Sequence, residues 1–128
     1  MTLAQLAAVL AAVGFLAIAV FQAALAAGAP LGRAAWGGAH RTLPANLRVS
    51  SAVAVVIWLA ATLIVLDRAG MALVDLPEAI STLGTWALVV VLPLGALLNV
   101  ASSSPYERFG WGPMALVLAA LTLVVALS

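Results

Sequence analysis

Four long apolar stretches are the feature that most constrains this sequence. A bilayer core about 30 Å thick is crossed by roughly 20 helical residues, and backbone groups in lipid must be hydrogen-bonded within the spanning segment. The four stretches cover about residues 3–27, 44–66, 76–99 and 113–127. We therefore expect an all-α fold, an integral membrane four-transmembrane-helix bundle that forms a single transmembrane domain over residues 1–128.

The composition supports a membrane protein and excludes several kinds of site. Hydrophobic residues make up 66% of the chain and charged residues only 7%, against about 45–50% and about 25% in soluble domains. A net charge of +1 is too small for nucleic-acid binding. With no cysteine and with His40 as the only histidine, the chain alone cannot build a thiolate, a His-based metal site or a bis-His haem site. We expect no cofactor, and the lipid bilayer is the expected partner.

The arginines predict the orientation of the bundle. Four of the five fall on one side of the predicted membrane: Arg33, Arg41, Arg48 and Arg108. The other side carries Arg68 beside the acidic residues Asp67, Asp75 and Glu78. Because cytoplasmic loops are enriched in arginine and lysine, the two long loops, residues 28–43 and 99–111, are expected in the cytoplasm and both termini outside it.

The third stretch carries small or polar residues at alternating steps of four and three, which places them on one helical face. These are Ser81, Thr85, Leu88, Leu92, Gly95, Asn99 and Ser102. Shorter counterparts lie in the second and fourth stretches: Arg48, Ser51, Val55, Trp58 and Thr62, and Ala115, Ala119, Thr122 and Ala126. Such faces either line an interior or let helices approach and hydrogen-bond one another, at about 0.6 kcal/mol per bond. In both cases the stripe should face protein, because lipid offers polar atoms no partner.

Two local signals suggest where helices begin. Asp75 and Glu78 have the spacing of a capping box at the start of the third stretch. Pro113 suits the first position of the fourth helix, which makes residues 99–111 a loop and the fourth helix the shortest.

The two long loops contain most of the chain's reactive side chains and form the candidate ligand or partner site. Its members are Trp36, His40, Arg41, Arg48, Asn99, Ser102, Tyr106, Glu107 and Arg108. We expect these loops to pack together and Glu107 to pair with Arg48 or Arg41, because a poorly hydrated carboxylate is costly without a guanidinium partner. The alternative is that the arginines only set the topology and that Trp36, Tyr106 and Trp111 form an aromatic belt.

A set of these residues resembles a known family. The set comprises Gly28 to Gly32, Trp36 to Gly38, Leu43, Pro44, Leu47, Arg48 and Ser51, followed by Asn99, Ser102, Ser104, Glu107, Arg108 and Pro113. Over most of the chain it is similar to an uncharacterised family of small bacterial four-helix inner-membrane proteins. The resemblance implies that fold and a bacterial inner membrane, and it implies no activity and no site residues.

Three kinds of function are compatible with the sequence. The first is a non-catalytic module that binds a partner protein, a lipid or a hydrophobic small molecule through the two loops. The second is an oligomeric small-solute transporter or channel without a membrane-embedded carboxylate, which proton-coupled exporters require. The third is a membrane hydrolase that uses a serine among residues 102–104 with His40 and Glu107, although no glycine flanks these serines as in a nucleophile elbow.

Overall fold

A computed structural model describes all residues of the chain, 1–128. It contains four long helices: α1 (Leu3–Ala26), α2 (Ala45–Arg68), α3 (Glu78–Val100) and α4 (Gly112–Leu127). Two short 3₁₀ turns, η1 (Gly32–Ala34) and η2 (Trp36–Gly38), lie between α1 and α2, and a π-helical segment, η3 (Glu107–Trp111), precedes α4. The fold is all-α, and all four helices are long and apolar enough to cross a membrane when η3 is counted with α4.

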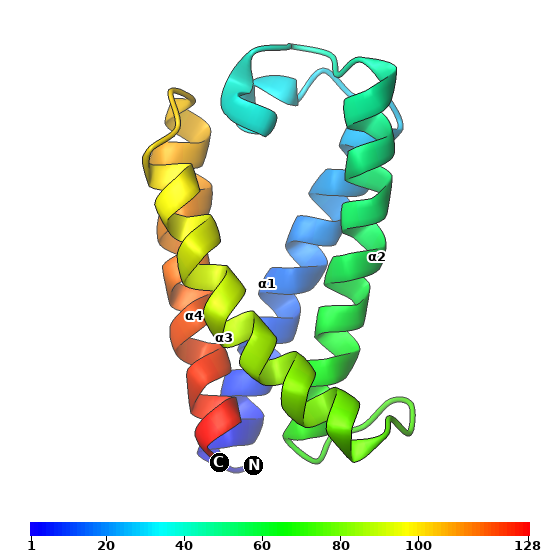
Figure 1. The fold of residues 1–128 in the computed structure, drawn as a ribbon, viewed down its shortest axis with the longest axis vertical. Helices are drawn as coiled ribbons and strands as arrows, with labels where there is room; N and C mark the ends of the chain where they lie inside the picture. The colour runs from blue at the N-terminus through cyan, green and yellow to red at the C-terminus, as the bar shows by residue number, and fades with distance from the viewer.

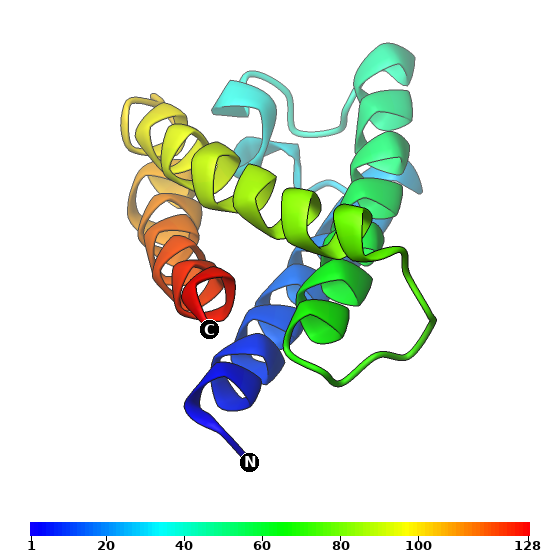
Figure 2. The ribbon, with the colours of Figure 1, turned by 60° about the horizontal axis from the view of Figure 1, so that its bottom comes forward.

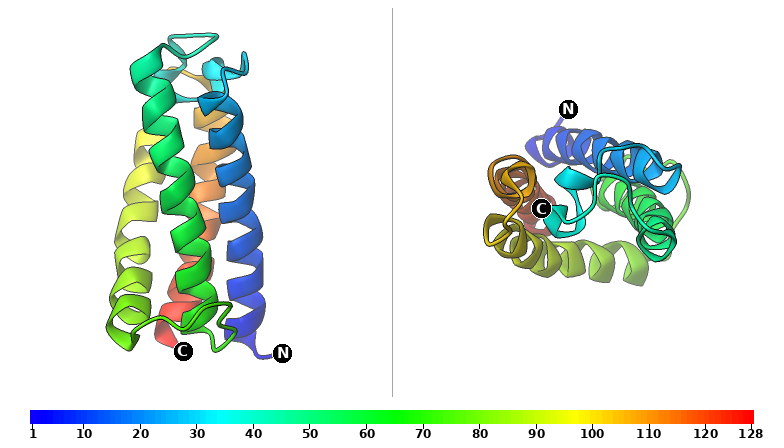
Figure 3. Two further views of the ribbon diagram at one scale, coloured as in Figure 1. Left: turned by 90° about the vertical axis from the view of Figure 1, so that its right-hand side faces the viewer. Right: turned by 90° about the horizontal axis from the view of Figure 1, so that it is seen from above.

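The helices form two pairs that diverge toward one end of the bundle. Helix α1 lies along α2, and α3 lies along α4 (Figure 1). Both long loops lie at the open end, which we call the loop end (Figures 1 and 3). The N-terminus, the C-terminus and the α2–α3 connection lie at the opposite, terminal end (Figure 2). The divergence leaves space between the pairs at the loop end.

The outer surface is apolar and the interior is small. Only 25 of the 128 residues are buried, whereas large side chains such as Leu98 and Val20 are 75% and 71% exposed. The buried face of α1 consists largely of alanines, and Gly14 lies so close to α4 that a Cβ there would be 2.5 Å from a methyl group of Leu118. Small residues of this kind let membrane helices pack closely, while lipid covers the outer apolar side chains.

The small and polar stripe of α3 faces the protein, as predicted. Ser81 and Thr85 are buried, and Asn99 is half-buried. The Thr85 hydroxyl donates to the Ser81 carbonyl oxygen at 2.7 Å, and Asn99 Nδ2 donates to the Gly95 carbonyl oxygen at 2.9 Å. The donors of Thr85 and Asn99 therefore hydrogen-bond within their own helix, so close packing rather than interhelical hydrogen bonding accounts for these positions.

The capping box expected at the start of α3 is absent, whereas the start of α4 near Pro113 is confirmed. Pro77, not Asp75, precedes the first turn of α3, and no side chain caps it. Helix α4 begins at Gly112 with Pro113 in its first turn. The π-helical η3 extends the fourth membrane-capable helix back to Glu107, so the expected loop of residues 99–111 shrinks to residues 101–104. The signal for this extension was present in the sequence, because Ser104 and Glu107 have capping-box spacing and Pro105 between them suits a first helical position.

Candidate functional site

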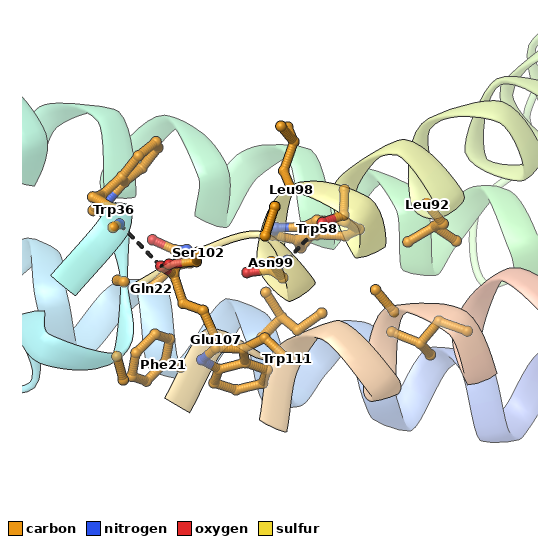
Figure 4. Close-up of a pocket in the computed structure, with 18 of the residues that line it drawn as sticks. Phe21, Gln22, Trp36, Trp58, Leu92, Leu98, Asn99, Ser102, Glu107 and Trp111 are labelled. Carbon is orange, nitrogen blue, oxygen red and sulfur yellow. Dashed lines mark hydrogen bonds between the residues drawn. The ribbon is translucent and has the colours of Figure 1, made fainter. Parts of the chain in front are cut away.

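A cavity of about 540 Å³ lies between the two helix pairs at the loop end (Figure 4). All four helices and both loops contribute to its wall, and 13 of its 20 lining residues are hydrophobic. The polar or aromatic members of the wall include Phe21, Gln22, Trp36, Trp58, Asn99, Ser102, Ser103, Glu107 and Trp111. Val91 and Leu98 also line the cavity and are 61% and 75% exposed, so it opens toward the outer surface beside α3.

The first loop folds inward and covers the loop end of this cavity. Seen from above, its short turns lie inside the ring of helices (Figure 3). Trp36, Gly37 and Gly38 all have positive φ, at 50°, 82° and 77°. This conformation is unfavourable for a tryptophan and marks a position held by its surroundings. The Trp36 indole supplies one such restraint, because its Nε1 donates to the buried hydroxyl of Ser51 on α2 at 3.0 Å.

Glu107 connects the two loops. Its Oε1 accepts a 3.0 Å hydrogen bond from the backbone N–H of Gly37 and a 2.6 Å hydrogen bond from the Ser102 hydroxyl. The Ser102 hydroxyl oxygen in turn accepts from the Ser104 N–H at 3.1 Å, and the Ser104 hydroxyl donates to the Arg33 carbonyl oxygen at 2.6 Å. The prediction that the loops pack on each other is confirmed.

The predicted ion pair between Glu107 and Arg48 or Arg41 is wrong. Arg48 Nε donates to the carbonyl oxygen of Ala26 at 3.0 Å, and Arg108 Nε donates to that of Val100 at 3.2 Å. These carbonyls close α1 and α3, where the last turn of a helix has no intrahelical donors and carries negative partial charge. Arg48 and Arg108 therefore bind carbonyl oxygens at helix ends and not Glu107. Arg41 is exposed, and its side chain makes no hydrogen bond.

The π-helical turn presents Glu107 at the start of the fourth membrane-capable helix. Its wider spacing is closed by a hydrogen bond from the N–H of Gly112 to the carbonyl oxygen of Glu107. Single π turns are rare and occur often at functional sites. The carboxylate therefore belongs to the first residue of a helix long enough to cross a membrane, as the carboxylate of Glu78 does in α3.

Three further aromatic side chains, Phe21, Trp58 and Trp111, and one glutamine complete the wall. The ring centroids of Phe21 and Trp111 lie 4.9 Å apart, and Trp58 stacks at 5.5 Å on the buried ring of Phe15. Gln22 Oε1 is enclosed and has no hydrogen-bond partner within the chain. Sequence reasoning did not include Phe21, Gln22, Trp58 or Trp111 in the site. Gln22 could have been found as an isolated polar side chain within an apolar stretch.

The structure divides the predicted site residues into two groups. Trp36, Asn99, Ser102 and Glu107 line the cavity, and the remaining five do not: His40, Arg41, Arg48, Tyr106 and Arg108. His40 is exposed, and its side chain makes no hydrogen bond, while Ser102 donates to Glu107. A serine, a histidine and a carboxylate are thus not assembled as a hydrolase triad would require. No group of three or more His, Cys, Asp or Glu side chains is placed to hold a metal ion.

Comparison of this chain with protein-family models, with curated proteins and with solved structures finds no match. The interpretation of the site therefore depends on its own geometry and chemistry.

Proposed function

We propose that this protein is a non-catalytic, membrane-embedded binding protein that holds a hydrophobic small molecule in the loop-end cavity. The observation that carries this proposal is the cavity itself, about 540 Å³ with predominantly apolar and aromatic walls. Binding sites for small molecules have volumes of about 300–1,000 Å³ and combine apolar walls with a few polar groups. The two loops form part of the site because residues 34–37 and 101–103 line it.

One unpartnered polar atom of the wall supports an occupant with a polar group. Asn99 uses its Nδ2 within α3 and leaves its side-chain oxygen without a donor. This oxygen is not enclosed, so a ligand that presents a hydrogen-bond donor could satisfy it.

The exposed lining residues favour entry from the bilayer. Val91 and Leu98 belong to α3, and the outer surface of this helix is otherwise apolar. Helices α2 and α3 diverge toward the loop end (Figure 1). A hydrophobic molecule dissolved in lipid would reach the cavity between them without crossing water.

For the cellular setting, we propose a bacterial cytoplasmic (inner) membrane with both loops in the cytoplasm and both termini extracytoplasmic. The resemblance to small bacterial membrane proteins supports the compartment. The four arginines at the loop end support the orientation. A protein partner or a second copy would contact the apolar outer faces of the helices, and nucleic acid is not an expected partner.

Transport of a small solute by an oligomer is the alternative. Glu107 favours it, because it is the only ionisable side chain of the cavity wall, and ionisable side chains that face the interior of a membrane bundle often belong to transport pathways. Transport also requires a route to the terminal end, where the helix pairs approach each other (Figure 1). Accumulation assays in vesicles would separate transport from binding alone.

A cavity-filling variant tests the proposed function. Gly95 lines the cavity, and a Cβ there would meet no atom within 4 Å, so Gly95→Phe can direct its ring into the cavity. Leu97→Phe is the matched control, because Leu97 lies on the same helix, is 67% exposed and does not line the cavity. Native mass spectrometry of the protein released from nanodiscs should show a bound hydrophobic molecule in the wild type and in Leu97→Phe, and none in Gly95→Phe. Equal occupancy in both variants, or no adduct in the wild type, would reject the proposal.

A further inference from the structure

We infer that the molecule bound in the loop-end cavity is a hydrophobic organic cation and that Glu107 provides the opposite charge. This inference rests on the proposed function and specifies its ligand class. The first observation is that Glu107 is the only ionisable side chain among the 20 that line the cavity. A binding site with one carboxylate and no cationic side chain is complementary to a single positive charge.

The carboxylate has an oxygen available for this role. Both hydrogen bonds to Glu107, from Gly37 and Ser102, involve Oε1. Oε2 accepts none, and it is not among the enclosed unpartnered atoms, so it remains accessible. Gly37 and Ser102 fix the carboxylate at the loop end of the cavity (Figure 4). A guest cation would therefore meet a carboxylate that is already positioned.

The neutral groups of the wall do not reverse the preference of the cavity for a positive charge. The indole N–H groups of Trp58 and Trp111 have no hydrogen-bond partner in the chain, and a guest anion could accept from them, but each is only a dipole. Glu107 carries a full charge, and an anion in the same apolar space would be repelled by it.

The aromatic walls favour a cation independently of Glu107. Phe21, Trp36 and Trp111 lie around Glu107 in the loop-end part of the cavity, and Trp58 lies deeper, where it stacks on Phe15 (Figure 4). The face of an aromatic ring attracts a cation within about 6 Å of its centre, and tryptophan is the most effective ring. Aromatic side chains around a carboxylate therefore suit an ion with an apolar body, such as a lipophilic ammonium or phosphonium ion.

The arginines argue against a phospholipid headgroup as the source of this positive charge. A zwitterionic headgroup would bring a phosphate as well, and a phosphate needs a cationic partner. Arg33, Arg48 and Arg108 each donate to backbone carbonyl oxygens, and none of the five arginines lines the cavity. A phosphate there would face Glu107 without compensation. We therefore assign the site to a free organic cation.

The test uses two ions of matched shape and opposite charge. The full-length protein is placed in nanodiscs, and equilibrium dialysis measures saturable binding of tetraphenylphosphonium and of tetraphenylborate, with protein-free nanodiscs as the blank. The wild type should bind tetraphenylphosphonium saturably and tetraphenylborate at the blank level. Glu107→Gln keeps an acceptor for Gly37 and Ser102 and removes the charge, so the affinity for tetraphenylphosphonium should fall about tenfold or more. Asp75→Asn removes a charge at the terminal end and should bind like the wild type.

The outcomes separate this inference from the proposed function. Equal binding of both ions, binding of neither, or an unchanged affinity in a folded Glu107→Gln protein would overturn the assignment of a cation. If Gly95→Phe still removed the native adduct in those cases, the cavity would remain a binding site for a hydrophobic molecule of another charge. If Glu107→Gln does not fold, the comparison of the two ions on the wild type decides the matter alone.

Discussion

The backbone N–H of Gly37 donates a 3.0 Å hydrogen bond to the carboxylate of Glu107, which lies 70 residues further along the chain. This contact joins the turn that covers the cavity to the first turn of the fourth membrane-capable helix. It also positions the only charged group of the cavity wall. A substitution in the covering loop is therefore expected to affect the carboxylate of Glu107, and a substitution of Glu107 is expected to affect the loop.

Glu107 should be coupled energetically to Ser102 and not to Arg48. The Ser102 hydroxyl donates to Glu107 at 2.6 Å, whereas Arg48 donates to the Ala26 carbonyl oxygen. A double-mutant cycle on Ser102→Ala and Glu107→Gln should give a coupling free energy of about 1 kcal/mol. The matched cycle on Arg48→Gln and Glu107→Gln should be additive within about 0.5 kcal/mol. Reversible unfolding in mixed micelles measures both, and stronger coupling to Arg48 would contradict the hydrogen-bond network described here.

Substitutions in the covering turn should destabilise the protein in a fixed order. Gly37 has φ of +82° with open space at its Cβ, so Gly37→Ala should cost about 1 kcal/mol from backbone strain alone. At Gly38, where φ is +77°, a Cβ would also lie 2.9 Å from the Arg33 carbonyl oxygen, so Gly38→Ala should cost more. Gly95→Ala is the control, because a helical glycine with open space should gain about 0.5–1 kcal/mol. Thermal unfolding in detergent should rank the three variants in this order, and a smaller loss for Gly38→Ala than for Gly37→Ala would be inconsistent with the turn geometry.

The indole of Trp36 should hold the covering loop against α2. Trp36→Phe removes the hydrogen bond to Ser51 and keeps an aromatic ring, with an expected loss of about 0.5–1.5 kcal/mol. Amide hydrogen exchange over residues 32–38 should accelerate in this variant. Trp86→Phe serves as the control, because Trp86 is 40% exposed on α3 and makes no hydrogen bond through its indole. Unchanged exchange in Trp36→Phe would show that the loop is held by other contacts.

Single cysteines can test the proposed orientation, because the chain has none of its own. Ala39→Cys places a thiol at an exposed position of the first loop, and Leu73→Cys places one at a position 71% exposed between α2 and α3. With the loop end in the cytoplasm, a membrane-impermeant maleimide should label Leu73→Cys in intact cells and Ala39→Cys only after permeabilisation. The reverse pattern would invert the proposed topology.

The sequence alone predicted the helices and the face of α3 that meets protein. Both predictions depend on local properties, because an apolar run of sufficient length satisfies its own backbone groups in lipid and the side-chain spacing defines a face. The π-helical extension in front of α4 was also encoded locally, by Ser104, Pro105 and Glu107. It was missed because Pro113 was interpreted as the first helical position, which made residues 99–111 a loop.

The partner of Glu107 and the cavity were decided by the tertiary structure. A carboxylate in need of a donor can be recognised in a sequence, but the donor proved to be a backbone N–H, which every residue except proline carries. The choice of Gly37 depends on positive φ angles in a turn that lies 70 residues away in the sequence. Arg48 was lost as a partner because it donates to a carbonyl oxygen at the end of α1, and Arg41 is exposed and makes no side-chain hydrogen bond. The cavity exists because the two helix pairs diverge at the loop end. The divergence depends on how small residues such as Gly14 pack at contacts between helices. Hydropathy along the chain does not determine this packing.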